Sequence, residues 1–206
     1  MSTLGFKVRD FQVFAVDGFN TRMELLYRYV RPKLVKLGGD LAPELSRKLE
    51  LEFFPHVAKH ARRTVNPPDE TWAAFGPSPK GYKRYGYLAL SISGAGLHAR
   101  AVVKSEADSR GEMANEIRAH ATDLAKSFRG TKIGRYEKWN FHNLPSMTSS
   151  DRAFFETIAD DLATKTGALD IGFGWSVSDS LRLDRSELLD AWSELGPLYR
   201  LLRAVS

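Results

Sequence analysis

The stretch Tyr87–Lys104, YLALSISGAGLHARAVVK, decides the fold, because it has the pattern of two strands joined by a tight turn. Apolar residues alternate with small or polar ones on both sides of Ser93-Gly94-Ala95-Gly96, which is a typical hairpin turn. One face of the expected hairpin is therefore apolar, and the other face carries His98, Arg100 and Lys104.

Helical patterns lie on both sides of this hairpin. Before it, we expect helices over Lys7–Phe14, Asn20–Leu37 and Ala42–Leu49. Pro32 should kink the second of these or split it in two, and Gly38-Gly39 should end it. After it, we expect helices over Ser109–Phe128 and Ser150–Thr164, and a last helix that opens at Asp184 and bends at Gly196-Pro197. Further strands are expected over Tyr136–Phe141 and Ala168–Val177.

This order of elements predicts the α+β class: one domain over residues 1–206, with helices packed on a largely antiparallel or mixed sheet. Alternating apolar residues of the strands need a covered face. We expect the sheet side of the core to consist of Leu88, Leu90, Ile92, Leu169, Ile171, Phe173 and Trp175.

Composition narrows the chemistry. The 206 residues include no cysteine, which rules out disulfides, thiolate metal sites and a cysteine nucleophile and fits a reducing compartment. The first residues lack the pattern of a signal peptide, and no apolar run approaches the roughly 18 residues of a membrane-spanning helix, so we expect a cytoplasmic protein without membrane partners. A net charge of +5 favours anionic partners, with weak, salt-dependent nucleic-acid binding. The oligomeric state stays open.

The segment Phe54–Lys83 concentrates polar chemistry that a core does not need, since ionised groups are costly to bury. Guanidinium forks suit phosphate or carboxylate, and the double proline stiffens the loop that carries them. In this interpretation the two arginines clamp an anion, His60 and Asn66 orient it, and Trp72 forms an apolar wall. The candidate ligand-binding residues are His56, His60, Arg62, Arg63, Asn66, Trp72 and Lys83.

Less specific interpretations of the same residues remain open. His56 and His60 share a face on a helix and also on a strand, but two histidines make no metal site, so we expect no bound metal. His98 or His142 would be the third ligand if a metal were bound. The arginines could instead pair with Glu52, Asp69 or Glu70, and Trp72 could belong to the core. No phosphate-binding glycine motif occurs, and we expect no cofactor.

Longer stretches of the chain resemble a known family. The run EFFPHVAKHARRTVNPPDETWAAF, followed by Gly81-Tyr82-Lys83, resembles the YktB-like family of uncharacterised bacterial proteins. The opening DFQVFAVDGFNTRM, Arg31–Leu34 and Leu198–Arg200 are similar to it as well. The resemblance implies a soluble single-domain α+β protein without an established activity. The family's central motif falls on the candidate residues together with Pro67, Pro68 and Gly81, and assigns them no catalytic role.

Three functions are compatible with these observations. The first is a binding protein for an anionic ligand at the candidate residues. The second is an enzyme acting on a phosphorylated or carboxylated substrate with His60 or His56 as acid or base. The third is a buried polar network that holds helices on the sheet, with the function elsewhere.

Overall fold

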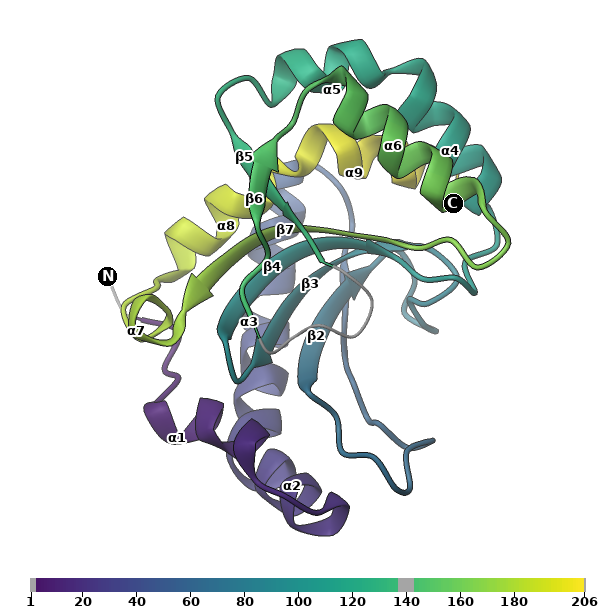
Figure 1. The fold of residues 1–206 in the computed structure, drawn as a ribbon. Helices are drawn as coiled ribbons and strands as arrows, with labels where there is room; N and C mark the ends of the chain where they lie inside the picture. Colours follow the sequence, from purple (N-terminus) through teal and green to yellow (C-terminus); the bar gives the residue numbers. More distant parts are fainter. Residues whose placement is uncertain (1–2, 137–142, 206) are drawn as a thin grey trace.

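The computed structural model describes residues 3–136 and 143–205, and within them the chain forms an antiparallel sheet backed by helices (Figure 1). The sheet has seven strands in the order β1-β2-β3-β4-β7-β5-β6. Their bounds are β1 (Phe54–Val57), β2 (Glu70–Gly76), β3 (Gly86–Ser93), β4 (Gly96–Val103), β5 (Lys132–Arg135), β6 (Met147–Ser149) and β7 (Leu169–Ser176). The predicted α+β class is confirmed, and each strand pairing is antiparallel.

The helices precede, interrupt and follow the strands. They are α1 (Val8–Gln12), α2 (Phe19–Leu25), α3 (Arg31–Leu49), α4 (Arg110–Ala119), α5 (Ala121–Ser127), α6 (Arg152–Ala163), α7 (Val177–Ser180), α8 (Arg185–Glu194) and α9 (Gly196–Ala204). A 3₁₀ turn, Val13–Ala15, follows α1, and a π-helical segment, Leu26–Val30, joins α2 to α3. In Figure 1 the long α3 and the yellow α8 and α9 lie behind the sheet, and α4, α5 and α6 lie together at one end.

The central hairpin forms as its pattern predicts. β3 and β4 pair from Gly86 with Val103 to Ser93 with Gly96, and every residue of both strands is buried. Gly96 takes a φ of 146°, and a Cβ added there would lie 1.8 Å from the carbonyl oxygen of Trp175 on β7. Only glycine allows the turn to approach the next strand this closely.

The residues expected on the core side of the sheet are buried, except for two near the end of β7 that are only half-buried. Phe173 and Trp175 are half-buried and pack against the core, whereas Leu169 and Ile171 are buried. β5 pairs with β7 only at Gly172 and Ile171, so the later part of β7 has no strand partner on that side within the described residues. The remaining expected core residues, Leu88, Leu90 and Ile92, are fully buried.

The expected helix boundary at Gly38-Gly39 is wrong. α3 continues through both glycines to Leu49, and the interruption near Pro32 is the π-helical segment that ends just before α3. A Cβ on Gly38 would lie 3.3 Å from the Cβ of Pro55. This glycine therefore lets β1 pack closely against the helix and does not end it.

Other boundaries differ in smaller ways. The helix expected over Ser109–Phe128 divides at His120, and the Ser109 side chain makes no capping hydrogen bond. β1, β2 and β6 were not predicted as strands. The expected strand Tyr136–Phe141 is displaced, because β5 ends at Arg135, and residues 137–142 lie outside the described residues. The predicted capping box of Asp184 and Glu187 is confirmed at the start of α8.

The two faces of the sheet have different surroundings. Helices α3, α8 and α9 contact the apolar face, whose residues belong to one continuous core with α4, α5 and α6. The opposite face carries a small apolar cluster of Ala74, Tyr87, Ala89 and Val102, surrounded by polar side chains. No described helix has both the length and the apolar character to cross a bilayer.

Candidate functional site

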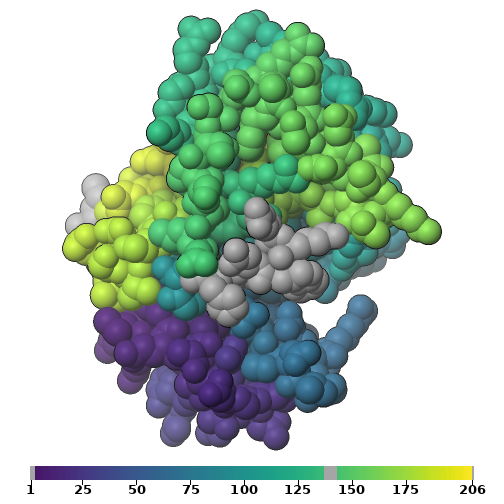
Figure 2. Space-filling view, viewed as in Figure 1, coloured from purple at the N-terminus to yellow at the C-terminus, as the bar shows by residue number. Residues whose placement is uncertain are grey.

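A cavity of about 1840 Å³ lies over the polar face of the sheet. Its walls come from the segment after β1, the β2–β3 loop, the residues after β4, and the start of β7. Figure 2 shows the surface hollowed between the blue residues near β1 and β2 and the green residues near α6. Pockets for small molecules usually measure about 300–1,000 Å³, so this cavity accommodates a ligand of substantial size.

Most of the candidate residues line this cavity. Asn66 is the exception, because it is not part of the wall and contributes only its carbonyl oxygen, which accepts a hydrogen bond from Arg63 Nη1 at 3.4 Å. The cavity walls contain the other six: His56, His60, Arg62, Arg63, Trp72 and Lys83.

The two histidines do not sit on one element. His56 is on β1, and its Nε2 donates to the carbonyl oxygen of Ser78 at 2.8 Å. His60 follows the strand in a left-handed turn with a φ of 51°, and its Nε2 lies 3.0 Å from Thr71 Oγ1. Burial, with smaller contributions from the charges of Arg63, Arg31 and Lys83, lowers the pKa of His60 to about 4. His60 is therefore neutral at pH 7.

The arginines do not form the structural ion pairs that were considered for them. Arg62 makes no hydrogen bond or ion pair with any residue that the structure describes. Within the described residues, Arg63 donates only to backbone carbonyls of its own loop, at 3.4 and 3.5 Å. Asp69 pairs with Arg22 at 3.2 Å, and Glu70 pairs with Arg100. Asp69 and Glu70 are therefore already paired with other arginines.

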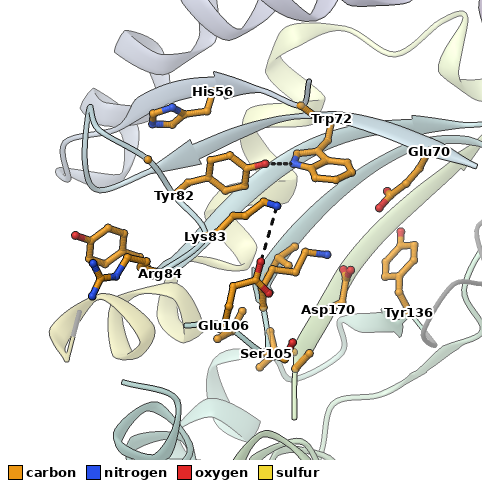
Figure 3. Close-up of a pocket in the computed structure, with 18 of the residues that line it drawn as sticks. His56, Glu70, Trp72, Tyr82, Lys83, Arg84, Ser105, Glu106, Tyr136 and Asp170 are labelled. Carbon is orange, nitrogen blue, oxygen red and sulfur yellow. Dashed lines mark hydrogen bonds and ion pairs between the residues drawn. The ribbon is translucent and has the colours of Figure 1, made fainter. Parts of the chain in front are cut away.

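Trp72 belongs to the cavity wall and not to the main core. It projects from β2 and is half-buried, and its Nε1–H donates to the hydroxyl of Tyr82 at 3.1 Å (Figure 3). The His60 ring meets it edge-on with centroids 5.5 Å apart, and the Lys104 ammonium lies 5.5 Å from its ring centre. These contacts hold the indole in one orientation beside a cation.

A buried charge cluster lies at the far end of the same cavity. Arg100 on β4 is 2% exposed and pairs with both Glu70 and Asp170, the latter at 2.8 Å. One positive charge is thus shared by two carboxylates. Burial raises the pKa of Asp170 to about 6, although the charges of Arg100 and Lys104 act in the opposite direction. Alternation along the hairpin placed Arg100 on the polar face, but nothing local indicated its partners.

A second buried network supports this end of the cavity. The Tyr136 hydroxyl donates to the carbonyl oxygen of Phe173 at 3.1 Å, so it accepts from His98 Nδ1 at 3.0 Å. The other ring nitrogen of His98 then accepts from the Ser93 hydroxyl at 3.0 Å. The pKa of His98 is lowered to about 3, mainly by burial. This histidine is therefore neutral at pH 7 and links the two hydroxyls by hydrogen bonds.

The cavity carries unbalanced positive charge. Every carboxylate in its wall is ion-paired: Asp69 with Arg22, Glu70 and Asp170 with Arg100, Glu106 with Lys83, and Asp161 with Arg135. Several cations of the wall have no carboxylate partner within the described part of the chain: Lys59, Arg62, Lys80 and Lys104. An anion entering the cavity therefore meets charges that the protein itself leaves uncompensated.

Metal ligands do not gather in the described ranges 3–136 and 143–205, where no three histidine, aspartate or glutamate side chains come together. His98 has both ring nitrogens engaged with Ser93 and Tyr136. His142, which was named as the other third ligand, lies outside the described residues.

Comparison with known proteins agrees with the resemblance seen in the sequence. A family model described as a domain of unknown function, DUF1054, matches residues 6–199. A UPF0637 protein of Bacillus velezensis is 32% identical over 219 residues, and one of Bacillus licheniformis is 33% identical over 213, each covering 100% of both chains. A UPF0637 protein of Lysinibacillus sphaericus is 46% identical over 112 residues, which are 54% of this chain and 53% of its own. The expected YktB-like relationship is confirmed, and the chain belongs to the DUF1054 family.

Proposed function

We propose that the chain binds a ligand bearing phosphate or carboxylate in the cavity on the polar face of its sheet. The observation that carries this proposal is the charge balance of the wall: its carboxylates are all paired, whereas Arg62 and Lys104, among others, have no carboxylate partner within the described residues. Unpaired cations in a partly enclosed site attract an anion more strongly than the same cations on an open surface.

The wall residues have distinct roles in this proposal. Arg62 presents a fork of donors that matches a phosphate or carboxylate, and Lys104 supplies a point charge beside Trp72. Lys83 is only loosely paired with Glu106, at 3.8 Å, so it can shift toward an incoming anion. Neutral His60 orients Trp72 by its edge contact and adds no charge of its own.

The alternative of a histidine acid or base gains no support from the geometry. The pKa of His60 is lowered to about 4, which makes it a weak base at neutral pH. The Nε2 of His56 is already bonded to the Ser78 carbonyl. Binding is therefore the function that these side chains support best.

We further propose that residues 1–206 act as one cytoplasmic domain.

We also propose that this domain binds nucleic acid only weakly. Few counterions would be released, because only four wall cations have side chains without an ion pair or hydrogen bond within the described residues: Lys59, Arg62, Lys80 and Lys104. The logarithm of the association constant for a labelled single strand should then fall against log salt with a slope no steeper than about −3, since each phosphate contact contributes about 0.7. A slope much steeper than this would contradict the assignment of these cations.

The test of anion binding uses isothermal titration with inorganic phosphate and pyrophosphate. Arg62→Ala and Lys104→Ala should each weaken binding several-fold, while unfolding free energy changes by about 0.5 kcal/mol or less. Arg129→Ala and Lys132→Ala are matched controls, because both residues are exposed cations that do not line the cavity. Equal loss in the controls, or no binding by the wild type, would refute the proposal.

A further inference from the structure

We infer that the ligand is a nucleoside phosphate. Its anionic group binds near β1 and β2, and one of its N–H or O–H groups donates a hydrogen bond to Asp170 on β7. The inference rests on the anion site proposed above and adds a second, chemically opposite contact. It assigns to Asp170 the role of a specificity-determining acceptor at the far end of the cavity.

The first observation is an unsatisfied acceptor. Asp170 Oδ2 accepts from Arg100 Nη1 at 2.8 Å, but Oδ1 is buried and has no hydrogen-bond partner among the described residues. Buried polar atoms normally have a partner, from the protein, from ordered water or from a ligand. The side chain is 15% exposed and belongs to the cavity wall, so a small adjustment brings this oxygen to a ligand.

The second observation is the local charge. Arg100 supplies one positive charge to two carboxylates, those of Glu70 and Asp170, so this end of the cavity has an excess of negative charge. Lys104 acts on Asp170 electrostatically but forms no ion pair with it. Burial holds the pKa of Asp170 near 6, which shows that its charged form is poorly stabilised. A ligand donor would supply the missing hydrogen bond.

The third observation is the length of the cavity. In Figure 3, Glu70, Asp170 and Tyr136 gather at one side, Lys83 and Tyr82 lie at the other, and Trp72 stands between them. β2 and β7 are separated by β3 and β4, which makes three strand spacings, or about 14 Å. A ligand that touches both ends is longer than inorganic phosphate and has a body that passes Trp72. A phosphate joined through a sugar to a nitrogen heterocycle has this size and sequence of groups.

The test measures dissociation constants by isothermal titration for inorganic phosphate and adenosine monophosphate. Wild type should bind adenosine monophosphate at least about tenfold more tightly than phosphate, since a hydrogen bond to a charged acceptor is worth about one to two orders of magnitude. Asp170→Asn should lose that advantage and leave phosphate affinity unchanged or slightly higher. Asp161→Asn is the matched control, because Asp161 also lines the cavity but pairs with exposed Arg135, and it should keep the advantage.

The outcomes separate the two proposals. No binding of either probe would refute the anion site itself. Phosphate binding with no added affinity for adenosine monophosphate, or with an unchanged advantage in Asp170→Asn, would overturn only the present inference.

If Asp170→Asn does not fold, the same contact can be tested with ligand analogues from which a hydrogen-bond donor has been removed. Wild type is then titrated with the analogue that lacks the amino group and with the one that lacks both ribose hydroxyls. At least one of them should bind about tenfold more weakly than adenosine monophosphate, and equal affinity for all three would overturn the inference.

Discussion

Arg100 and Asp170 come from adjacent strands and are joined by a hydrogen bond of 2.8 Å from Nη1 to Oδ2. Asp170 lies opposite Val102 in the ladder, two positions along from the pairing of Arg100 with Gly172 and therefore on the same face of the sheet. Gly172 leaves room at this point, since a Cβ there would lie 2.0 Å from the carbonyl oxygen of Ala99. The diagonal hydrogen bond between Arg100 and Asp170 therefore links β4 to β7 on the face of the sheet that borders the cavity.

Removing the Arg100 guanidinium, which Glu70 and Asp170 share, should greatly lower the free energy of unfolding. Arg100→Met leaves Glu70 and Asp170 buried without a counter-charge, and losing one partner of such a cluster costs about 3–5 kcal/mol. Urea unfolding measures this loss. Arg118→Ala, which breaks an exposed pair with Asp160, should cost about 0.5 kcal/mol or less. Equal effects of the two changes would contradict a buried cluster.

Asp170 should make the protein less stable as the pH rises from about 4 to about 6. Its folded pKa of about 6 lies above the ordinary aspartate pKa of 3.8, so the folded state binds the extra proton in this window. The expected loss is about 2–3 kcal/mol, at about 1.4 kcal/mol for each pKa unit. Unfolding free energy of wild type minus that of Asp170→Asn, followed from pH 4 to 7, isolates this contribution; a flat difference would show that Asp170 does not titrate there.

His60 and His98 should have the opposite effect on the pH dependence of stability. Folding lowers the pKa of His60 to about 4 and of His98 to about 3, so the unfolded chain binds more protons below about pH 6.5 and stability falls as the solution is acidified. His60→Gln should reduce this acid sensitivity between about pH 4 and 6.5. Stability is measured by urea unfolding at each pH, with exposed His120→Gln as the control. Identical profiles for wild type and His60→Gln would contradict a buried, neutral His60.

Two glycine substitutions should have opposite effects. Gly96→Ala brings a methyl group to within 1.8 Å of the Trp175 carbonyl oxygen and strains a backbone with a φ of 146°, so we expect loss of the folded hairpin. Gly111→Ala in α4 meets no atom within 4 Å and should stabilise by about 0.4–1 kcal/mol. Melting temperatures check both, and a stable Gly96→Ala protein would show that β7 is not packed against this turn.

Local patterns predicted much of the fold. Alternation in Tyr87–Lys104 and Ala168–Val177 sets which side chains share a face, because the side-chain period of a strand is two wherever the strand pairs. The capping box at Asp184 spans only four residues, so it too can be predicted from the sequence. The basic segment after Phe54 was likewise visible as a concentration of polar side chains, and most of its candidate residues line the cavity.

The partners within the site depended on strand order, which no local pattern contains. Arg100 finds Glu70 thirty residues away and Asp170 seventy residues away, and these choices follow from β4 lying between β3 and β7. Gly38 ends no helix because β1 packs against it, and Trp72 faces a cavity because helices cover only the other face of β2. Local sequence therefore determined the elements and their faces, whereas tertiary packing decided which charges are neutralised inside the protein and which remain for a ligand.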